Sequence, residues 1–142
     1  MTDERKMKMD LNENGFVTEN LPALDGSDAK EVADAIAEIL DSKKARDIKV
    51  LHVEDKTVIA EYFVLCTGNS STQVKALAGE VEFRTEQRGL PPYSVEGRDN
   101  NSWILIDYSN VIVHVFSREA REFYNLDKLY GDSSAVSVST ED

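Results

Sequence analysis

The sequence is poor in the residues from which cross-links are made, because it has one cysteine and two histidines. Cys66 cannot form an internal disulfide, which is typical of a reducing compartment, and we expect its thiol to be buried and unreactive. His52 and Cys66 do not stand at the spacing of zinc ligands, so we expect no metal and no cofactor. The 41% of apolar residues among 142 are enough to form the core of one compact domain.

Long hydrophobic runs are also missing. No segment approaches the roughly 18 to 20 consecutive apolar residues of a membrane span. The N-terminal stretch MTDERKMKMDLNENG lacks the hydrophobic part of a secretory signal. We therefore expect a cytoplasmic protein that does not interact with membranes.

Positive charge is scarce, since 16 basic residues stand against 27 acidic ones and give a net charge of -11. Phosphate contacts need clustered lysine and arginine, so we expect no direct, specific binding to nucleic acid. Such acidity favours a basic protein partner, although it also serves solubility alone.

Composition divides the chain into three parts. Residues 1–26 have no apolar periodicity and are predicted to form a flexible acidic extension. Residues 132–142 are rich in serine, threonine and acid and are predicted to be disordered. Residues 27–131 contain the periodic segments, carry 18 acids and 13 bases, and are predicted to form one domain.

Within that domain, the patterns predict helices and strands in the order α, β, β, α, β, β, β, α. Asp28 with Glu31 resembles a capping box, and Ser70 begins a second helix that Gly89 ends. The predicted segments are helix 28–42, strands 47–53 and 58–66, helix 70–88, strand 93–96, a hairpin over 103–116, and helix 117–125 anchored by Phe123, Leu126 and Leu129. This order predicts an α/β (α+β) domain with a mixed β-sheet flanked by helices.

The hairpin sequence WILIDYSNVIVHVF is predicted to organise the domain, with Ser109 and Asn110 as its turn. Alternation then places the two faces of the hairpin apart. The core face is aliphatic apart from one tyrosine and consists of Ile104, Ile106, Tyr108, Val111, Val113 and Val115. The other, mixed face consists of Trp103, Leu105, Asp107, Ile112, His114 and Phe116. A face of this composition is either covered by a helix or offered to a partner.

The sequence offers little for catalysis. The turn from Gly68 to Ser71 precedes a helix, as in anion sites, but it lacks the lysine and spacing of a P-loop, and capping by Ser70 explains it. Asp107 has no second carboxylate with which to hold Mg²⁺, and it lies diagonally from His114. We predict no catalytic residue. The alternative is a nucleotide-binding or nucleotidyl-transfer enzyme that uses the Gly68 to Ser71 turn.

Five segments stand out in this order: DIKVLHV, AEYFVLCTGNSSTQVKALAGEV, GLPPYSVEG, WILIDYSNVIVHVF and REFYNLDKLYGD. Together they resemble the ribosomal silencing factor family, RsfS or Iojap, over about residues 28–132. The resemblance implies a nucleotidyltransferase-like fold without the catalytic carboxylates. It also implies binding to a basic protein of the large ribosomal subunit, ribosomal protein number fourteen, where the small subunit would dock. Subunit joining would then be blocked and translation repressed when nutrients are scarce.

By this resemblance, a set of residues from the hairpin and the segment before it would face the partner: Trp103, Asp107, Tyr108, Glu96, Gly97 and His114. The chain departs from the family at Ser109-Asn110, where Gly-Asp is usual. It also departs at Gly79, where Asp is usual, and at Tyr130, where Trp is usual. The family's role is non-enzymatic, and a homodimer that pairs the same face off the ribosome stays open as a further interpretation.

Overall fold

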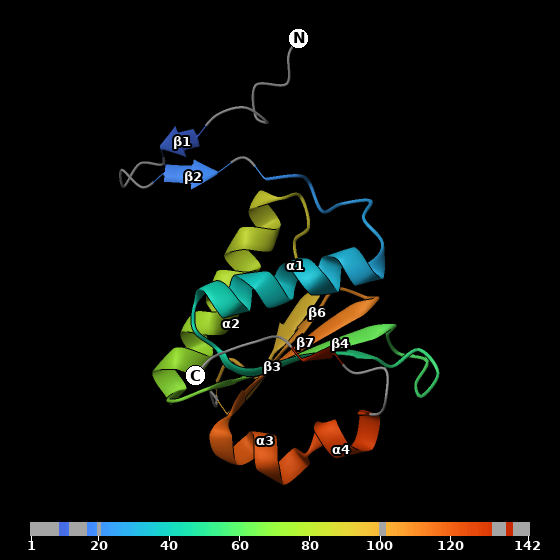
Figure 1. The fold of residues 1–142 in the computed structure, drawn as a ribbon. Coiled ribbons are helices and arrows are strands. Elements are labelled where there is room, and N and C mark those ends of the chain that lie inside the picture. Colours follow the sequence, from blue (N-terminus) through green and yellow to red (C-terminus); the bar gives the residue numbers. More distant parts are fainter. Residues whose placement is uncertain (1–8, 12–16, 20, 100–101, 132–135, 138–142) are drawn as a thin grey trace.

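The computed structural model describes residues 9–11, 17–19, 21–99, 102–131 and 136–137, and its main body is a mixed sheet between helices (Figure 1). The helices are α1 (Ala29–Ser42), α2 (Ser71–Gln87), α3 (Arg118–Tyr124) and α4 (Leu126–Tyr130). The strands of the sheet are β3 (Arg46–His52), β4 (Tyr62–Gly68), β5 (Ser94–Glu96), β6 (Trp103–Asp107), β7 (Val111–Ser117) and β8 (Val136–Ser137). They pair in the order β5-β6-β7-β4-β3-β8. The predicted α+β class is confirmed.

The helices divide into two layers. α1 and α2 lie on one face of the sheet, whereas α3 and α4 lie on the other (Figure 1). Each layer has its own apolar cluster: the larger joins α1 and α2 to the sheet, and the smaller lies beneath α3 and α4. Among the described residues, no helix is long and apolar enough to cross a membrane.

Local signals explain where the two long helices begin and end. The carboxylate of Asp28 accepts from the backbone N–H of Glu31 at 2.9 Å, and the Glu31 side chain accepts from the N–H of Asp28 at 3.2 Å. This is the predicted capping box. Ser70 Oγ likewise accepts from the N–H of Gln73 at 3.0 Å. Gly89, with φ +85°, follows α2 in the left-handed conformation that ends it.

The second predicted strand begins too early. The apolar run from residue 58 predicted a strand at once, but β4 starts at Tyr62. Val58 is fully exposed and Ile59 is 58% exposed, because the N–H of Val53 bonds the carbonyl of Glu61 at 2.8 Å and closes a loop. β-branched residues therefore formed no strand here, since no neighbouring strand pairs with them.

Two of the three predicted anchors of the last helix were wrong, whereas the third, Leu126, packs against the smaller apolar cluster. Phe123 is 79% exposed and Leu129 is 64% exposed. α3 is held instead by Ala120 and by Arg121, whose guanidinium bonds both carboxylate oxygens of Asp127 at 2.8 and 2.9 Å. The same guanidinium donates to Thr67 Oγ1 of β4 at 2.8 Å. An ion pair between buried Arg121 and partly buried Asp127 thus holds α3 and α4 together against the sheet.

Both terminal segments contain paired strands that the sequence did not predict. In the extension predicted over residues 1–26, β1 (Met9–Leu11) pairs with β2 (Val17–Glu19), and Leu24 is buried, with its N–H 2.7 Å from the carbonyl of Arg88. In the tail predicted to be disordered over residues 132–142, β8 pairs antiparallel with β3. The remainder of both predictions falls outside the described residues.

Candidate partner-binding face

The central hairpin has the predicted register. Trp103 pairs with Phe116, Leu105 with His114, and Asp107 with Ile112, so the two faces separate as the alternation required. The aliphatic face is buried against α1 and α2. The hairpin therefore sends its mixed face to the side of the sheet on which α3 and α4 lie.

The two strands that form the mixed face differ in how deeply their side chains are buried. On β7, Ile112, His114 and Phe116 are buried, because α3 packs over β7 and β4. On β6, Trp103, Leu105 and Asp107 are only partly buried. Both interpretations of the mixed face thus hold, each for one strand: helices cover the β7 half, whereas the β6 half stays accessible.

β5 extends the accessible half to the edge of the sheet. Ser94 pairs with Asp107 and Glu96 pairs with Leu105, so these side chains point to the same side as those of β6. We call this surface the β5–β6 face, and it consists of Ser94, Glu96, Trp103, Leu105 and Asp107. Its two acids stand beside an indole and a leucine. An acidic, partly aromatic surface of this kind suits a basic protein partner.

Trp103 is both a surface residue and a packing residue. Its indole Nε1 donates to Nδ1 of His114 at 3.1 Å. Its ring centroid lies 5.1 Å from that of Phe116 and 4.4 Å from that of Tyr124 on α3. The neighbouring rings hold the indole in one orientation, so little side-chain entropy is left to lose when a partner covers its open side.

His114 is a neutral, buried member of this cluster. It is 4% exposed, and burial, followed by the charge of Arg121, lowers its pKa to about 3. Because Nδ1 accepts from Trp103, the ring proton belongs on Nε2. That nitrogen is buried without a hydrogen-bond partner in the described part of the chain. His114 cannot touch a partner directly in this arrangement, and it acts on the face by fixing the indole.

Asp107 stands at the end of β6 and shapes the turn. Its Oδ1 accepts from the N–H of Ser109 at 2.7 Å, and Ser109 has φ +75°. The N–H of Asn110 bonds the carbonyl of Tyr108 at 3.0 Å, while the Asn110 carbonyl accepts from Glu61 at 2.8 Å. One carboxylate oxygen thus stabilises a turn conformation that favours glycine, and the other, which has no bond to the described residues, can meet a cation.

Tyr108 points into the core and away from the β5–β6 face. It is 9% exposed, and its hydroxyl lies 2.8 Å from Thr85 Oγ1 on α2. Burial raises the pKa of Tyr108 well above its usual value, so the hydroxyl keeps its proton. The tyrosine links the tip of the hairpin to α2. A change at Tyr108 can therefore affect a partner only by moving the turn.

Gly97 directly follows β5, at a position where its backbone comes so close to Trp103 that only glycine fits. Its φ is +91°, and a Cβ added there would overlap the carbonyl oxygen of Trp103. Only glycine both adopts this positive φ readily and lacks the Cβ that would collide with Trp103. Glu96, directly before it, is exposed at the edge of the sheet.

Polar groups of the Gly68 to Ser71 turn form hydrogen bonds with the first turn of α2. Ser70 caps α2, and the side chain of Gln73 accepts from the N–H of Asn69 at 2.5 Å. An added Cβ on Gly68 would lie 2.9 Å from Val74 Cγ2, so tight packing of strand on helix accounts for this glycine. In the described ranges, no group of three or more His, Cys, Asp or Glu side chains is placed to hold a metal ion.

The sequence pattern did not place the aromatic residues of α3, Phe123 and Tyr124, at the surface beside Trp103. Tyr124 is 47% exposed beside Trp103, and the rings of Phe123 and Tyr124 lie 4.9 Å apart. A signal was present in the sequence: two adjacent aromatics on a short helix cannot both face its core. These rings widen the apolar surface next to the β5–β6 face.

Comparison with known proteins supplies independent information. Residues 26–142 match the family model described as "Ribosomal silencing factor during starvation". The ribosomal silencing factor RsfS of Bacillus subtilis is 39% identical over 104 residues, which are 73% of this chain and 88% of that protein. A crystal structure of a protein from Chromobacterium violaceum has a TM-score of 0.71 at 28% identity, covering 81% of this chain and 97% of that one.

A more distant relative carries a different name. A mouse protein named "Mitochondrial assembly of ribosomal large subunit protein 1" is 30% identical over 105 residues, which are 72% of this chain and 46% of that protein. Its name refers to the large ribosomal subunit.

Proposed function

Because this chain belongs to the ribosomal silencing factor family, we propose that it binds the large ribosomal subunit and keeps the small subunit from joining it. Translation would then be repressed when nutrients are scarce. The family match and the name of the mouse relative support the link to the large subunit. The action we propose is steric, since a bound protein needs only to occupy the surface on which the other subunit docks.

The partner we propose is a basic protein of the large subunit, ribosomal protein number fourteen. The observation that carries this proposal is that α3 covers β7 while the β5–β6 face stays accessible, with Glu96 and Asp107 beside Trp103. The net charge of -11 adds long-range attraction to a basic protein. Acids at the rim would set orientation and association rate, and the indole would supply apolar contact.

We assign different roles to the residues of the site. Trp103, Glu96 and Asp107 would touch the partner. His114, Gly97 and Tyr108 would hold these residues in position. His114 accepts a hydrogen bond from the Trp103 indole (Nε1 to Nδ1, 3.1 Å), and Gly97 lets its backbone approach the carbonyl oxygen of Trp103 closely. Tyr108 fixes the hairpin turn next to Asp107 through its contact with Thr85.

We propose that the protein is not an enzyme and acts in the cytoplasm. The backbone and side chains of the Gly68 to Ser71 turn bond one another, and Asp107 Oδ1 is committed to the N–H of Ser109. A nucleotide would therefore have to displace existing contacts at the first place, and a metal ion would meet one carboxylate at the second. Turnover of a nucleotide that Asp107→Asn abolishes would contradict the proposal.

A homodimer off the ribosome would use the same β5–β6 face in this account. Covering the partly exposed Trp103 and Leu105 would bury apolar surface in the absence of ribosomes. Dimer and ribosome-bound forms would then exclude each other. Native mass against protein concentration, with and without large subunits, tests this.

The function itself is tested by a sucrose-gradient profile of purified subunits. Large and small subunits are mixed with increasing amounts of protein under conditions that favour joining. We expect the joined ribosome peak to fall and the protein to sediment with the large subunit alone. Unchanged joining in the presence of excess folded protein would refute the proposed function.

A further inference from the structure

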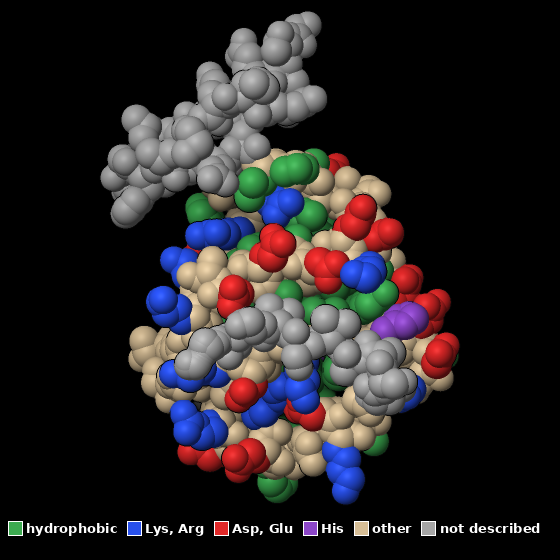
Figure 2. Space-filling model, in the orientation of Figure 1, with side chains coloured by type: hydrophobic (Ala, Val, Ile, Leu, Met, Phe, Trp, Pro, Cys, Tyr) green, Lys and Arg blue, Asp and Glu red, His purple; other side chains and the backbone are tan. Residues whose placement is uncertain are grey.

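Basic side chains gather at one end of the sheet, although the chain as a whole is acidic. Lys43 and Lys44 directly follow α1, and Arg46 opens β3, where it pairs with Thr67 near the end of β4. Arg118 opens α3 at the end of β7. Lys and Arg side chains gather over the end of α1 and the start of α2 on the left of Figure 2, whereas Asp and Glu are frequent on the right.

Strand pairing brings these segments together. The last residues of β4 and β7, Gly68 and Ser117, are partners in the parallel ladder. The Arg118 guanidinium donates to Asn69 Oδ1 at 3.1 Å, across the turn that leads into α2. Lys75 stands one turn into that helix. We call this group the basic end, and it consists of Lys43, Lys44, Arg46, Lys75 and Arg118.

The cations of the basic end are not held in ion pairs with described residues. Within the described ranges, Lys43, Lys44, Arg46, Lys75 and Arg118 form no salt bridge, whereas other bases of the domain do. All five residues are exposed. The acids within one helical turn of them in the sequence are Asp41, Asp47, Glu119 and Glu122, which is one fewer than the five cations. In a chain with 27 acids, a surface with more cations than anions stands out as a binding surface.

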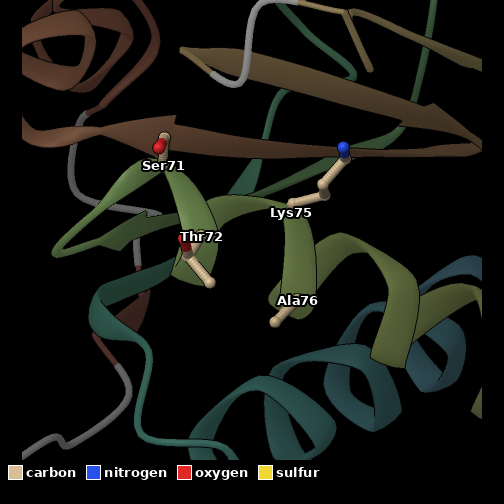
Figure 3. Close-up of a pocket in the computed structure, with 4 residues that line it drawn as sticks. All are labelled: Ser71, Thr72, Lys75 and Ala76. Atoms are coloured by element: carbon tan, nitrogen blue, oxygen red, sulfur yellow. The ribbon is translucent and has the colours of Figure 1, made fainter.

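A shallow pocket on α2 adds hydroxyl groups to these cations. Ser71, Thr72, Lys75 and Ala76 line it, and Ser71 and Lys75 point to the same side of the helix (Figure 3). Hydroxyl and ammonium groups are the usual partners of phosphate oxygens. The cations come from three separate stretches of the chain, residues 43–46, Lys75 and Arg118, and are spread over a surface, as contact with a chain of phosphates requires.

The basic end also borders the β5–β6 face. The N–H of Ser117 bonds the carbonyl of Ser102 at 2.7 Å, and Trp103 is the next residue. A partner that covers Trp103 therefore brings its surroundings close to Arg118. On the large subunit, the surroundings of any protein include RNA.

We propose that the basic end contacts the phosphate backbone of ribosomal RNA while the β5–β6 face holds the protein partner. This inference rests on the proposed function. The contact is with phosphates and not with bases, so it adds affinity and orientation without sequence specificity. It is compatible with the acidic net charge because only the local surface has to be positive.

The first test is the salt dependence of binding to purified large subunits. The variant Lys43→Gln, Lys44→Gln, Lys75→Gln removes three charges of the basic end. A matched control, Lys30→Gln, Lys56→Gln, Lys128→Gln, removes three charges elsewhere. Each lost phosphate contact lowers the slope of log affinity against log salt by about 0.7 to 0.9, so we expect a slope smaller by about 2 and an affinity roughly tenfold lower at low salt. The control should match the wild type.

The outcomes of this test are distinct. If both triple variants bind as the wild type does, with the same slope, the basic end has no such role and the proposed function stands. If the wild type itself does not sediment with large subunits, the proposed function fails and this inference fails with it.

The second test separates RNA from an acidic protein. Cys66 is fully buried and burial raises its pKa to about 12, so a new surface cysteine can be labelled selectively. Ser71→Cys and, as a control in the exposed loop before β4, Val58→Cys are labelled with a photocrosslinker and bound to large subunits. We expect a ribonuclease-sensitive crosslink from position 71 and none from position 58. A crosslink from position 71 to protein alone would overturn the proposal.

Discussion

Trp103 and His114 form one unit, in which the indole N–H of the first donates to Nδ1 of the second at 3.1 Å. The exposed side of the pair belongs to the β5–β6 face, and the buried side belongs to the core under α3. A change at either residue therefore acts on stability and binding together, unless the two effects are measured separately.

Trp103→Phe tests the unit through stability. It keeps an aromatic ring but leaves Nδ1 of a buried imidazole without its donor, which typically costs about 1 to 3 kcal/mol in the free energy of unfolding. His114→Phe alone should cost a similar amount, because it strands the indole N–H. The double variant should lose clearly less than the sum of the two. Urea unfolding of all four proteins gives the coupling energy, and strict additivity would mean that the hydrogen bond contributes nothing.

The lowered pKa of His114 predicts how stability depends on pH. The folded protein takes up this proton only near pH 3, whereas an unfolded histidine takes it up near its ordinary value of 6.5. The contribution is therefore complete above about pH 6.5 and is lost as the pH falls toward about 3, with a slope of up to about 1.4 kcal/mol per pH unit. Urea midpoints between about pH 7 and about pH 4.5 should fall in the wild type. In His114→Asn the midpoints should fall far less, and equal slopes would contradict the assignment.

Arg121 should be far more important for stability than the lysine that shares its partner. Arg121→Met leaves Asp127 without its bidentate donor and Thr67 without its bond, and we expect a loss of about 2 to 3 kcal/mol, because Asp127 remains partly hydrated. Lys49 also contacts Asp127 at 3.0 Å, but its side chain is 37% exposed, so Lys49→Met should cost less than about 1 kcal/mol. Thermal melts of both variants, side by side, make the comparison. Similar losses of stability in the two variants would mean that Arg121 is not the residue that holds α3 and α4 against the sheet.

The boundary of the domain predicts two different truncations. Deleting residues 1–20 should leave folding and binding nearly unchanged. Deleting residues 1–26 removes buried Leu24 and its bond to Arg88, and we expect a further loss of about 2 kcal/mol or more. Leu24→Ala in the full chain is the matched control and should account for most of that loss. Equal melting temperatures for the two truncations would place the boundary after residue 26, as the sequence pattern alone suggested.

The sequence predicted best where a local rule and a tertiary pairing agree. The hairpin register followed from the alternation of Ile104, Ile106, Val113 and Val115, and the start of α1 followed from Asp28 and its capping box. Prediction failed where an apolar side chain stays outside the core, as at Val58 and Phe123. Periodicity states which face a side chain is on, and it does not state whether another element covers that face.

The same limit explains the candidate site. Alternation placed Trp103 and Asp107 on one face, but only the position of α3 decides that His114 on that face is buried while Leu105 is partly open. The resemblance to the family put Tyr108 toward the partner, whereas its hydroxyl lies beside Thr85 in the core. The basic end was not predicted at all, because its lysines and arginines are scattered over more than 70 positions and only strand pairing joins them.

The most direct measurement of the central claim is the dissociation constant for large subunits after charge reversal on the β5–β6 face. Glu96→Lys with Asp107→Lys places two cations opposite a basic partner, and Asp55→Lys with Glu86→Lys makes the same change of net charge at exposed positions elsewhere. Melting curves first establish that both variants are folded. We expect at least about thirtyfold weaker binding, or about 2 kcal/mol, and restored subunit joining for the first pair, with little change for the second. A folded Glu96→Lys, Asp107→Lys protein that binds as tightly as its control and still blocks joining would place the interface elsewhere.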